Sequence, residues 1–334
     1  VLGVGCSDPY TASLNGTQSD LKSRGPINPS TGVFSGTYTD PTAPSALPSS
    51  LRERVMVARN DLNPALNTGA IYVTECQYIH PDDASSGNDN NNASYRLATV
   101  GATWSTTQGY PLTLTGATIQ QQPAIFAWKV AHSDVTITPV DVVGDGRFLV
   151  GSRAIDNGNG TWRYEYAVQN LNSDRAGGSF SIPLPSGAVV TGASFKGPKY
   201  MNGEPYTNAD WSYTVSGGMI TFTCEPNTNA NANALRWSTL YNFRFTCDKA
   251  PAAGNATLGL WKNPTASSTA TSANAAATVP SGPPPIPGDL DGNGSVDAAD
   301  LATMLSSWGT NGADLNGDNS TDASDLAILL GNWG

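Results

Sequence analysis

The end of the chain, residues 289–334, contains one short unit written twice. The first copy, DLDGNGSVDAADLATMLSSWG, occupies Asp289–Gly309, and the second, DLNGDNSTDASDLAILLGNWG, occupies Asp314–Gly334. Each position of the first copy recurs 25 residues later, so that Trp308 corresponds to Trp333. Both copies begin with acidic and small polar residues and finish with an apolar stretch. Whatever local structure the first copy adopts, the second is expected to repeat.

Each copy opens with oxygen-bearing side chains at the spacing of a calcium-binding loop. Ca²⁺ takes about six to eight oxygen ligands, and an EF-hand-type loop of about twelve residues supplies them from positions 1, 3, 5, 7, 9 and 12. The ligands predicted for the first loop are Asp289, Asp291, Asn293, Ser295, Asp297 and Asp300. The ligands predicted for the second loop are Asp314, Asn316, Asp318, Ser320, Asp322 and Asp325. The sequence thus predicts two bound Ca²⁺ ions.

Positions 6 and 12 of the two loops refine this prediction. Position 6 needs a left-handed backbone, which Gly294 supplies in the first loop and Asn319 in the second. Position 12 is Asp rather than the Glu of an ordinary EF-hand loop. Because Asp is shorter than Glu, the helix that follows is expected to lie closer to the metal.

The residues after each loop have the spacing of an amphipathic helix. The apolar positions of the two predicted helices are Leu301, Met304, Leu305 and Trp308, and Leu326, Leu329, Leu330 and Trp333. Four prolines at positions 283, 284, 285 and 287 exclude a helix before the first loop. The predicted unit is therefore a loop followed by a helix, present twice.

This arrangement resembles a type I dockerin, the calcium-dependent docking module of bacterial extracellular assemblies. The resemblance implies a small α-helical module that binds a protein partner. Known dockerins commonly carry a Ser-Thr pair at loop positions 10 and 11 to contact cohesin. Those positions are Ala298-Ala299 and Ala323-Ser324 here. Two partners therefore stay open, a cohesin-like scaffold and another copy of the same chain.

The distribution of charge excludes one class of partner. The formal net charge is -10, but residues 289–334 hold eight Asp and no Lys or Arg. The remaining residues carry 19 acidic and 17 basic side chains, so most of the negative charge belongs to predicted metal ligands. There is no basic patch, which argues against nucleic acid as a partner.

Composition favours a secreted protein. Charged residues make up only 13% of the chain, which is rich in Gly, Asn, Ser, Thr and Pro. The sequence starts at Val1 rather than at a methionine, which a removed signal peptide would explain. No apolar run reaches the roughly 20 residues of a membrane span. Calcium loops of this kind also suit the millimolar Ca²⁺ outside cells.

The four cysteines are Cys6, Cys76, Cys224 and Cys247. In an extracellular protein an even number predicts two disulfides, and three pairings are open. Proximity in sequence favours Cys6–Cys76 with Cys224–Cys247, and buried free thiols are the alternative. The chain has only two histidines, His80 and His132, which argues against a zinc centre.

Residues 1–263 have the pattern of an antiparallel β-sandwich, with 1–116 as a separate β-rich subdomain in one version of this prediction. Strands with alternating apolar residues recur between turn signals, and Gly144-Asp145-Gly146 indicates a hairpin. The segments YEYAVQNLNSDRAGGSFSIPLP and NALRWSTLYNFRFTC, with VGCSDPY near the start, resemble an uncharacterised family of secreted bacterial β-sandwich proteins. That resemblance implies the fold and no activity.

Two segments are less regular, one between the body and the C-terminal repeat and one within the body. Residues 264–288 are rich in Ala, Ser, Thr and Pro, which predicts a linker between the body and the calcium-binding module. Residues 80–94 crowd Asp and Asn into one loop. A solvated turn is the simpler interpretation of that loop, and a third calcium site is the alternative.

No catalytic constellation is recognisable in the sequence. A glycosidase needs two facing carboxylates, and nothing in the spacing pairs the available ones, Glu75, Glu165, Glu204 and Asp210. A carbohydrate-binding surface would need exposed tryptophans, for which Trp104, Trp211 and Trp261 are the candidates. We therefore expect a non-enzymatic structural protein, such as a self-polymerising filament or surface-layer subunit. The alternative is a polysaccharide-binding or polysaccharide-degrading protein tethered by its dockerin-like tail.

Overall fold

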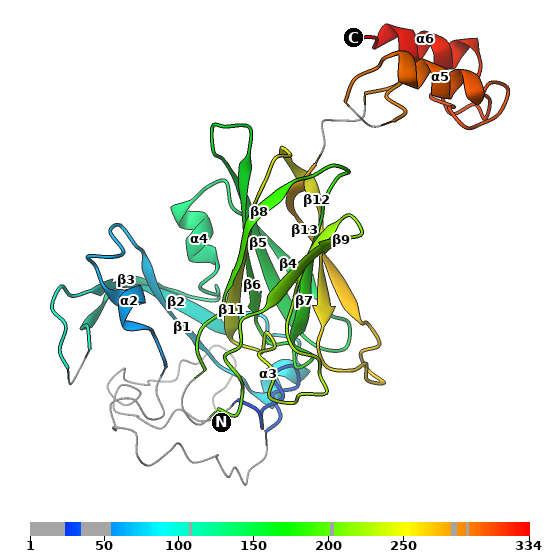
Figure 1. Ribbon diagram of the computed structural model, residues 1–334. Coiled ribbons are helices and arrows are strands. Elements are labelled where there is room, and N and C mark those ends of the chain that lie inside the picture. Colours follow the sequence, from blue (N-terminus) through cyan, green and yellow to red (C-terminus); the bar gives the residue numbers. More distant parts are fainter. Residues whose placement is uncertain (1–23, 35–54, 107–108, 201–203, 282–285, 292–293) are drawn as a thin grey trace.

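The computed structural model describes residues 24–34, 55–106, 109–200, 204–281, 286–291 and 294–334. The fold is mainly β, and every paired strand runs antiparallel to its neighbour (Figure 1). The first large sheet, called here the β5 sheet, has the order β4 (Thr136–Asp141), β5 (Arg147–Asp156), β6 (Trp162–Asn170), β11 (Thr239–Cys247) and β8 (Val190–Lys196). The second, the β7 sheet, has the order β13 (Ser272–Pro280), β12 (Pro251–Leu260), β7 (Gly177–Pro183), β10 (Met219–Thr223) and β9 (Ser212–Ser216).

Alternating side chains of the two large sheets form the main core. Tyr166 and Phe243 of the β5 sheet meet Phe180 of the β7 sheet, with ring centroids 5.5 and 5.1 Å from that of Phe180. All three side chains are buried. Edge-to-face and tilted ring contacts of this kind add to the stabilisation from apolar burial. The alternation read from the sequence therefore marks the core, and the predicted antiparallel sandwich is confirmed.

The hairpin predicted at Gly144-Asp145-Gly146 joins β4 to β5. The turn of this hairpin is closed by the backbone N–H of Val142, which donates to the carbonyl of Gly146 over 2.8 Å. Gly144 has a φ of +71°, a conformation that favours glycine. Beyond the turn, Asp141 pairs with Arg147 and Thr136 with Ser152 in one continuous register.

The predicted linker at 264–288 is wrong in its central part, because Ser272–Pro280 forms strand β13. This strand pairs with β12 from Pro251↔Pro280 to Gly259↔Ser272. Its alternate residues Ala275, Ala277 and Val279 are buried in the core. Small side chains suit this position because β13 also lies close to the edge strand β4, where the two sheets approach each other. There the Thr138 hydroxyl donates to the carbonyl of Ala276 over 2.7 Å.

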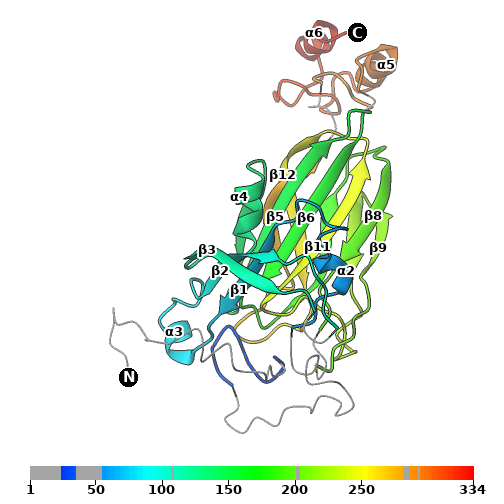
Figure 2. The same ribbon diagram turned by 90° about the vertical axis from the view of Figure 1, so that its left-hand side faces the viewer.

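A third, small sheet of β1 (Tyr72–Gln77), β2 (Ala93–Val100) and β3 (Leu112–Ile119) lies against the outer face of the β5 sheet (Figure 2). Two side chains of β1 make the contact. The amide of Gln169 donates to both carboxylate oxygens of Glu75 at 2.9 Å, and the amide of Gln77 donates to the carbonyl of Leu171 at 2.9 Å. Among the described residues of the body, short helices are α2 (Arg59–Leu62), α3 (Pro81–Ser85) and α4 (Phe126–Ala131).

The acidic loop at 80–94 is tied to its surroundings by ordinary hydrogen bonds. His80 caps α3 by accepting from the backbone N–H of Asp82 over 3.2 Å. Asp83 accepts a hydrogen bond from Asn92, and Asp89 accepts one from Asn172 over 2.7 Å. The carboxylates that a third calcium site would need thus have separate protein partners.

The cysteine pairing predicted within the sandwich is wrong. Cys76, Cys224 and Cys247 are free thiols, and Cys6 lies outside the described residues. Cys247 ends β11 of the β5 sheet, whereas Cys224 follows β10 of the β7 sheet, where its N–H donates to the carbonyl of Gly178. The two cysteines therefore belong to different sheets, and neither thiol forms a disulfide in the described residues.

The C-terminal repeat forms two further helices, α5 (Ala298–Ser306) and α6 (Ala323–Gly331), drawn in orange and red in Figure 1. Their contact is centred on four buried residues, Val296, Met304, Ala313 and Leu329. Each copy of the repeat contributes to this core, which explains why the unit occurs twice. One copy alone would leave its apolar face without a partner.

Candidate metal centre

The two loops of the repeat have the same internal geometry. The helix after each loop begins with a capping box, in which Asp297 and Asp300 cap α5 and Asp322 and Asp325 cap α6. The side chain of Asp297 accepts from the N–H of Ala299 at 2.8 Å, and that of Asp322 accepts from Ser324 at 2.7 Å. The acidic residues at positions 9 and 12 therefore fix where each helix begins.

The carboxylate at position 12 organises each loop. Asp300 accepts from the N–H groups of Leu290 at 2.7 Å, Asp291 at 3.1 Å and Asp297 at 2.9 Å. The same three bonds recur 25 residues later, where Asp325 accepts from Leu315, Asn316 and Asp322 at 2.7, 3.1 and 2.9 Å. These bonds tie the start of each helix to its loop. That the short Asp brings the helix closer to the metal stays a prediction.

Both position-12 carboxylates are buried and ionised. Asp300 and Asp325 are fully buried side chains. The backbone N–H of Asp297, together with those of Asp291 and Leu290, holds the pKa of Asp300 below its usual range. The N–H of Asp322, with those of Leu315 and Asn316, does the same to the pKa of Asp325. Each loop thus keeps a negative charge at its centre.

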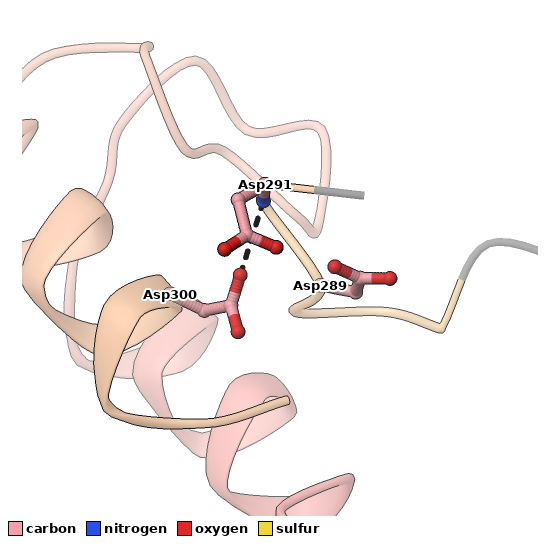
Figure 3. A group of neighbouring side chains, drawn as sticks. All are labelled: Asp289, Asp291 and Asp300. Atoms are coloured by element: carbon pink, nitrogen blue, oxygen red, sulfur yellow. Dashed lines mark hydrogen bonds between the residues drawn. The ribbon is translucent and has the colours of Figure 1, made fainter. Parts of the chain in front are cut away.

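Three carboxylates converge in the first loop. Oxygen atoms of Asp289, Asp291 and Asp300 all lie within 4.8 Å of one another (Figure 3). Asp289 enters from the start of the loop, and the dashed line in Figure 3 marks the bond from the N–H of Asp291 to Asp300. Such a spacing leaves room for one cation between the three groups, and hard oxygen ligands suit Ca²⁺.

The second loop has fewer carboxylates close together. It carries Asn316 where the first loop has Asp291, and its amide donates to Asp318 at 2.8 Å. The described residues of this loop show no group of three neighbouring carboxylates. Asp314 instead accepts from the backbone N–H groups of Gly317 and Asn319 at 2.7 and 2.6 Å. The first loop is therefore the better prepared cation site of the two.

Two predicted features of the loops are confirmed by the backbone. Gly294 has a φ of +91° and Asn319 a φ of +70°, the left-handed conformation expected at position 6. Of the other predicted ligands, Ser295, Asp297, Ser320 and Asp322 lie in the loops, whereas Asn293 lies outside the described residues. Calcium binding by the two loops stays a prediction.

A reciprocal contact between the two copies of the repeat has no signal in the sequence. The N–H of Gly309, after α5, donates to the carbonyl of Thr321 in the second loop at 2.9 Å. The N–H of Gly334, after α6, donates to the carbonyl of Val296 in the first loop at 3.1 Å. These bonds join equivalent positions of the repeat in both directions. Periodicity within one copy cannot show them, because each bond links two copies.

Not all of the predicted helix positions are buried. Met304 and Leu329 are fully buried, but Leu305 and Leu330 are 54% and 53% exposed, and Trp308 and Trp333 are 45% and 46% exposed. The last four residues, two from each copy of the repeat, are exposed apolar side chains and are together called here the Leu-Trp face. Their exposure is thus the same at equivalent places of the two copies.

The carboxylates considered for glycoside cleavage have separate partners. Glu75 is bonded by Gln169, Glu165 pairs with Arg163 at 2.9 Å, and Glu204 pairs with Arg24 at 3.4 Å. Asp210 is exposed.

The tryptophans considered for sugar binding are mostly inside the protein. Trp211 and Trp261 are 4% and 9% exposed, and their indole N–H groups donate to the carbonyls of Asn233 and Glu225. Trp104 is half-buried, with the guanidinium of Arg59 4.4 Å from its ring centroid. These three rings therefore do not offer a row of stacking platforms.

Comparisons with known proteins do not assign this chain to a family. No family model matches the chain, and no curated protein matches it. Among solved structures, the crystal structure of the serine-rich repeat adhesion glycoprotein Srr1 from Streptococcus agalactiae is similar over 56% of this chain and 73% of that one, with 12% identity and a TM-score of 0.26. In the part of the chain that the structure describes, none of the helices has the length and apolar character needed to cross a bilayer.

Proposed function

We propose that the chain is a secreted, non-enzymatic structural protein that assembles through a calcium-loaded, dockerin-like module formed by residues 289–334. The observation that carries this proposal is the convergence of Asp289, Asp291 and Asp300 in a loop whose hydrogen bonds recur in the second copy. Three carboxylates so close together repel one another unless a cation lies between them. Calcium would therefore act as a folding ligand of the module.

The Leu-Trp face supports the assembly step. Its four side chains are neutral and apolar, so its partner should offer a complementary apolar surface. That partner is another copy of this chain or a cohesin-like scaffold. Docking of one copy's module on another copy's body is a heterologous contact, and such contacts build filaments when they do not close into a ring. The chain would then be the repeating subunit of a filament or of a surface layer.

The test is the particle size of the full chain in calcium and in excess chelator, measured by light scattering and negative-stain microscopy. We expect long polymers in calcium that fall to monomers in chelator. Monomers in both conditions would exclude self-assembly and leave a different protein as the docking partner. Polymers that persist after removal of the metal has been verified would contradict the calcium-dependent mechanism.

A second candidate function, glycan binding, is favoured by one specific site on the body. Two adjoining pockets of about 440 and 430 Å³ lie on the outer face of the β5 sheet, and both are lined by Trp128 of α4. The Trp128 ring packs over Gly151, where an added Cβ would lie 2.9 Å from it. The larger pocket is lined further by polar side chains, Glu165, Ser194, Lys196, Asn242 and Arg244.

Two of the three charged side chains that line this pocket are paired with opposite charges and the third, Arg244, is hydrogen-bonded, which suits a neutral, hydroxyl-rich ligand. Glu165 pairs with Arg163 at 2.9 Å, Lys196 with Asp61 at 3.6 Å, and Arg244 donates to Ser194 at 2.8 Å. Affinity electrophoresis in gels containing soluble neutral polysaccharides tests the idea. Trp128→Ala should abolish any retardation, and Tyr213→Ala, an exposed ring on the β7 sheet, should leave it unchanged. Equal migration with and without each polysaccharide would rule this function out.

A further inference from the structure

A buried arginine lies beside a small cavity at one end of the sandwich. Arg236 is 8% exposed, and its guanidinium carbon lies 3.6 Å from the ring centroid of Tyr206 and 4.8 Å from that of Trp261. One terminal nitrogen donates to the carbonyls of Ala230 and Ala232, at 3.0 and 3.3 Å. The side chain is thus held between two rings and fixed at its tip.

Two N–H donors of consecutive residues here find no acceptor in the part of the chain that the structure describes. They are the Nε of Arg236 and the Nε1 of Trp237, both of them buried atoms. Both groups can only donate, so another donor cannot satisfy them. Buried polar groups are nearly always hydrogen-bonded, because each unpaired one loses its hydration without compensation. Two such groups on consecutive residues call for an acceptor.

The charge of Arg236 is also uncompensated. The other cations at the site have carboxylate partners, since Arg24 pairs with Glu204 at 3.4 Å and Lys262 with Asp174 at 2.7 Å. Arg236 makes no ion pair with any carboxylate of the described residues. Stacking on two rings offsets part of the cost of burying this charge. A nearby anion would offset the rest.

The cavity itself limits the size of that anion. It has a volume of about 30 Å³ and is lined by Arg236, Trp237, Arg24, Lys262 and Tyr206 among others. The same kind of volume is about 440 Å³ for the larger Trp128 pocket, so this cavity is small by comparison. Its size favours one monatomic ion over sulfate, phosphate or a carboxylate-bearing metabolite. The lining includes three cationic side chains, Arg24, Arg236 and Lys262, and one carboxylate, Asp174.

We propose that this cavity binds a monatomic anion, chloride in a saline medium, held by the Nε of Arg236 and the Nε1 of Trp237. Chloride accepts both hydrogen bonds and supplies the missing negative charge. A water molecule would satisfy the two donors but would leave the charge of Arg236 uncompensated, and its own two hydrogens would need acceptors. The inference is independent of the calcium-binding module.

An occupied site would join two parts of the chain that are far apart in sequence. Arg24 donates from its side chain to the carbonyl of Trp237 at 3.0 Å and from its backbone to Glu204 at 3.1 Å. The described segment 24–34 is therefore attached to the loop that carries Arg236. Chloride would tighten this attachment, so its effect should be seen in the stability of the body.

The experiment compares halides with larger anions on the full chain in calcium. Thermal unfolding is followed in sodium chloride, bromide, sulfate and gluconate at equal ionic strength. Chloride and bromide should raise the unfolding midpoint by about 2–4 °C in a saturable way, because the ligand binds only the folded state. Sulfate and gluconate should lack this saturable component.

Substitutions and crystallography test whether the effect of halides on the unfolding midpoint arises at this cavity. Trp237→Phe removes one donor and should weaken the halide response about tenfold in concentration, and Arg236→Met should abolish it. Arg244→Met, an exposed arginine on β11, is the matched control and should keep the response. Crystals grown in bromide should show an anomalous peak within hydrogen-bonding distance of the two donors, which tests the site even if Arg236→Met fails to fold. Equal midpoints in all four salts, or density at this place that is only water without anomalous signal, would overturn the proposal.

Discussion

Asp300 and Asp325 hold the same place in the two copies of the repeat, and each gathers three backbone N–H groups onto one buried carboxylate. The spacing of the ligands identified these residues in the sequence, and so did the need for a left-handed residue at Gly294 and Asn319. Their role in holding the loop before any metal binds was not predictable. It depends on hydrogen bonds to the backbone, which leave no signal in residue type.

Substitution of Asp300 by Asn tests this role. The variant keeps the size of the side chain but replaces one acceptor oxygen with an amide and removes a negative charge. We expect calcium affinity of the first loop to fall by about 10- to 100-fold, the effect typical of losing a group that orients metal ligands. Isothermal titration of the full chain with Ca²⁺ measures it. Asp325→Asn provides the matched comparison in the second loop, and unchanged binding in both variants would show that the carboxylates are not used.

At the scale of elements, β13 shows where composition misleads. Ala, Ser and Thr without large apolar residues indicate a linker, because such a segment cannot form a core of its own. In β13 the small side chains instead complete a core built by others, with Ala275 and Ala277 facing inward beside β4 and β12. The alternation is present in the sequence, but alanine carries too weak a hydrophobic signal for it to be recognised.

Alanine-to-aspartate substitutions distinguish a strand from a linker here. Ala275→Asp would bury an unpaired charge and should lower the free energy of unfolding by about 3–5 kcal/mol. Ala276→Asp, on the next and exposed residue, should change it by less than about 0.5 kcal/mol. Urea denaturation followed by tryptophan fluorescence measures both. Equal stability of the two variants would mean that β13 does not pack in the core.

The contact between β1 and the β5 sheet depends on a carboxylate in a poorly solvated place. Burial raises the pKa of Glu75 above its ordinary value, and the bonds from Ala124 and Gln169 only partly offset this. Its folded pKa is therefore higher than its unfolded one, near 4.3. The stabilisation that this shift supplies is complete below the unfolded pKa and is lost as pH rises through the folded pKa.

Glu75→Gln should remove this pH dependence. The neutral amide avoids the cost of burying a charge, so at pH 7 we expect the variant to unfold about 1–3 °C higher than the original protein. At pH 4.5 the difference should shrink. Differential scanning calorimetry at the two pH values measures it, with Glu165→Gln as a control on a surface ion pair. A variant that is less stable at both values would show that the Glu75 charge itself stabilises the contact.

For the whole molecule, the sequence was sufficient to predict an antiparallel sandwich and a repeated loop-helix unit at its end. Both features can be recognised from the periodicity of residues within short stretches of the sequence. It was not sufficient for the cysteines, because Cys224 and Cys247 are close in sequence yet belong to different sheets. Nor could it identify the Trp128 pockets, which form only when α4 packs across the β5 sheet.

The Leu-Trp face allows assembly to be separated from calcium binding. In the double variant Trp308→Gln and Trp333→Gln, the loops and their buried core are untouched, so calcium affinity should stay within about twofold of the original. Assembly in calcium, measured by light scattering, should be lost because the exposed apolar contact is removed. Loss of both properties together would mean that the tryptophans support the fold of the module. Retention of both would place the docking surface elsewhere.

The bonds from Gly309 to Thr321 and from Gly334 to Val296 make each loop depend on the helix of the other copy. When an ion orders one loop, the second loop is therefore also partly ordered and loses less conformational entropy when it binds its own ion. The two sites should fill as a positively cooperative pair, with a Hill coefficient above 1 in a calcium titration. Such a module would respond to a narrow range of calcium concentration, and the chain would change between its free and assembled forms more sharply than two independent sites allow.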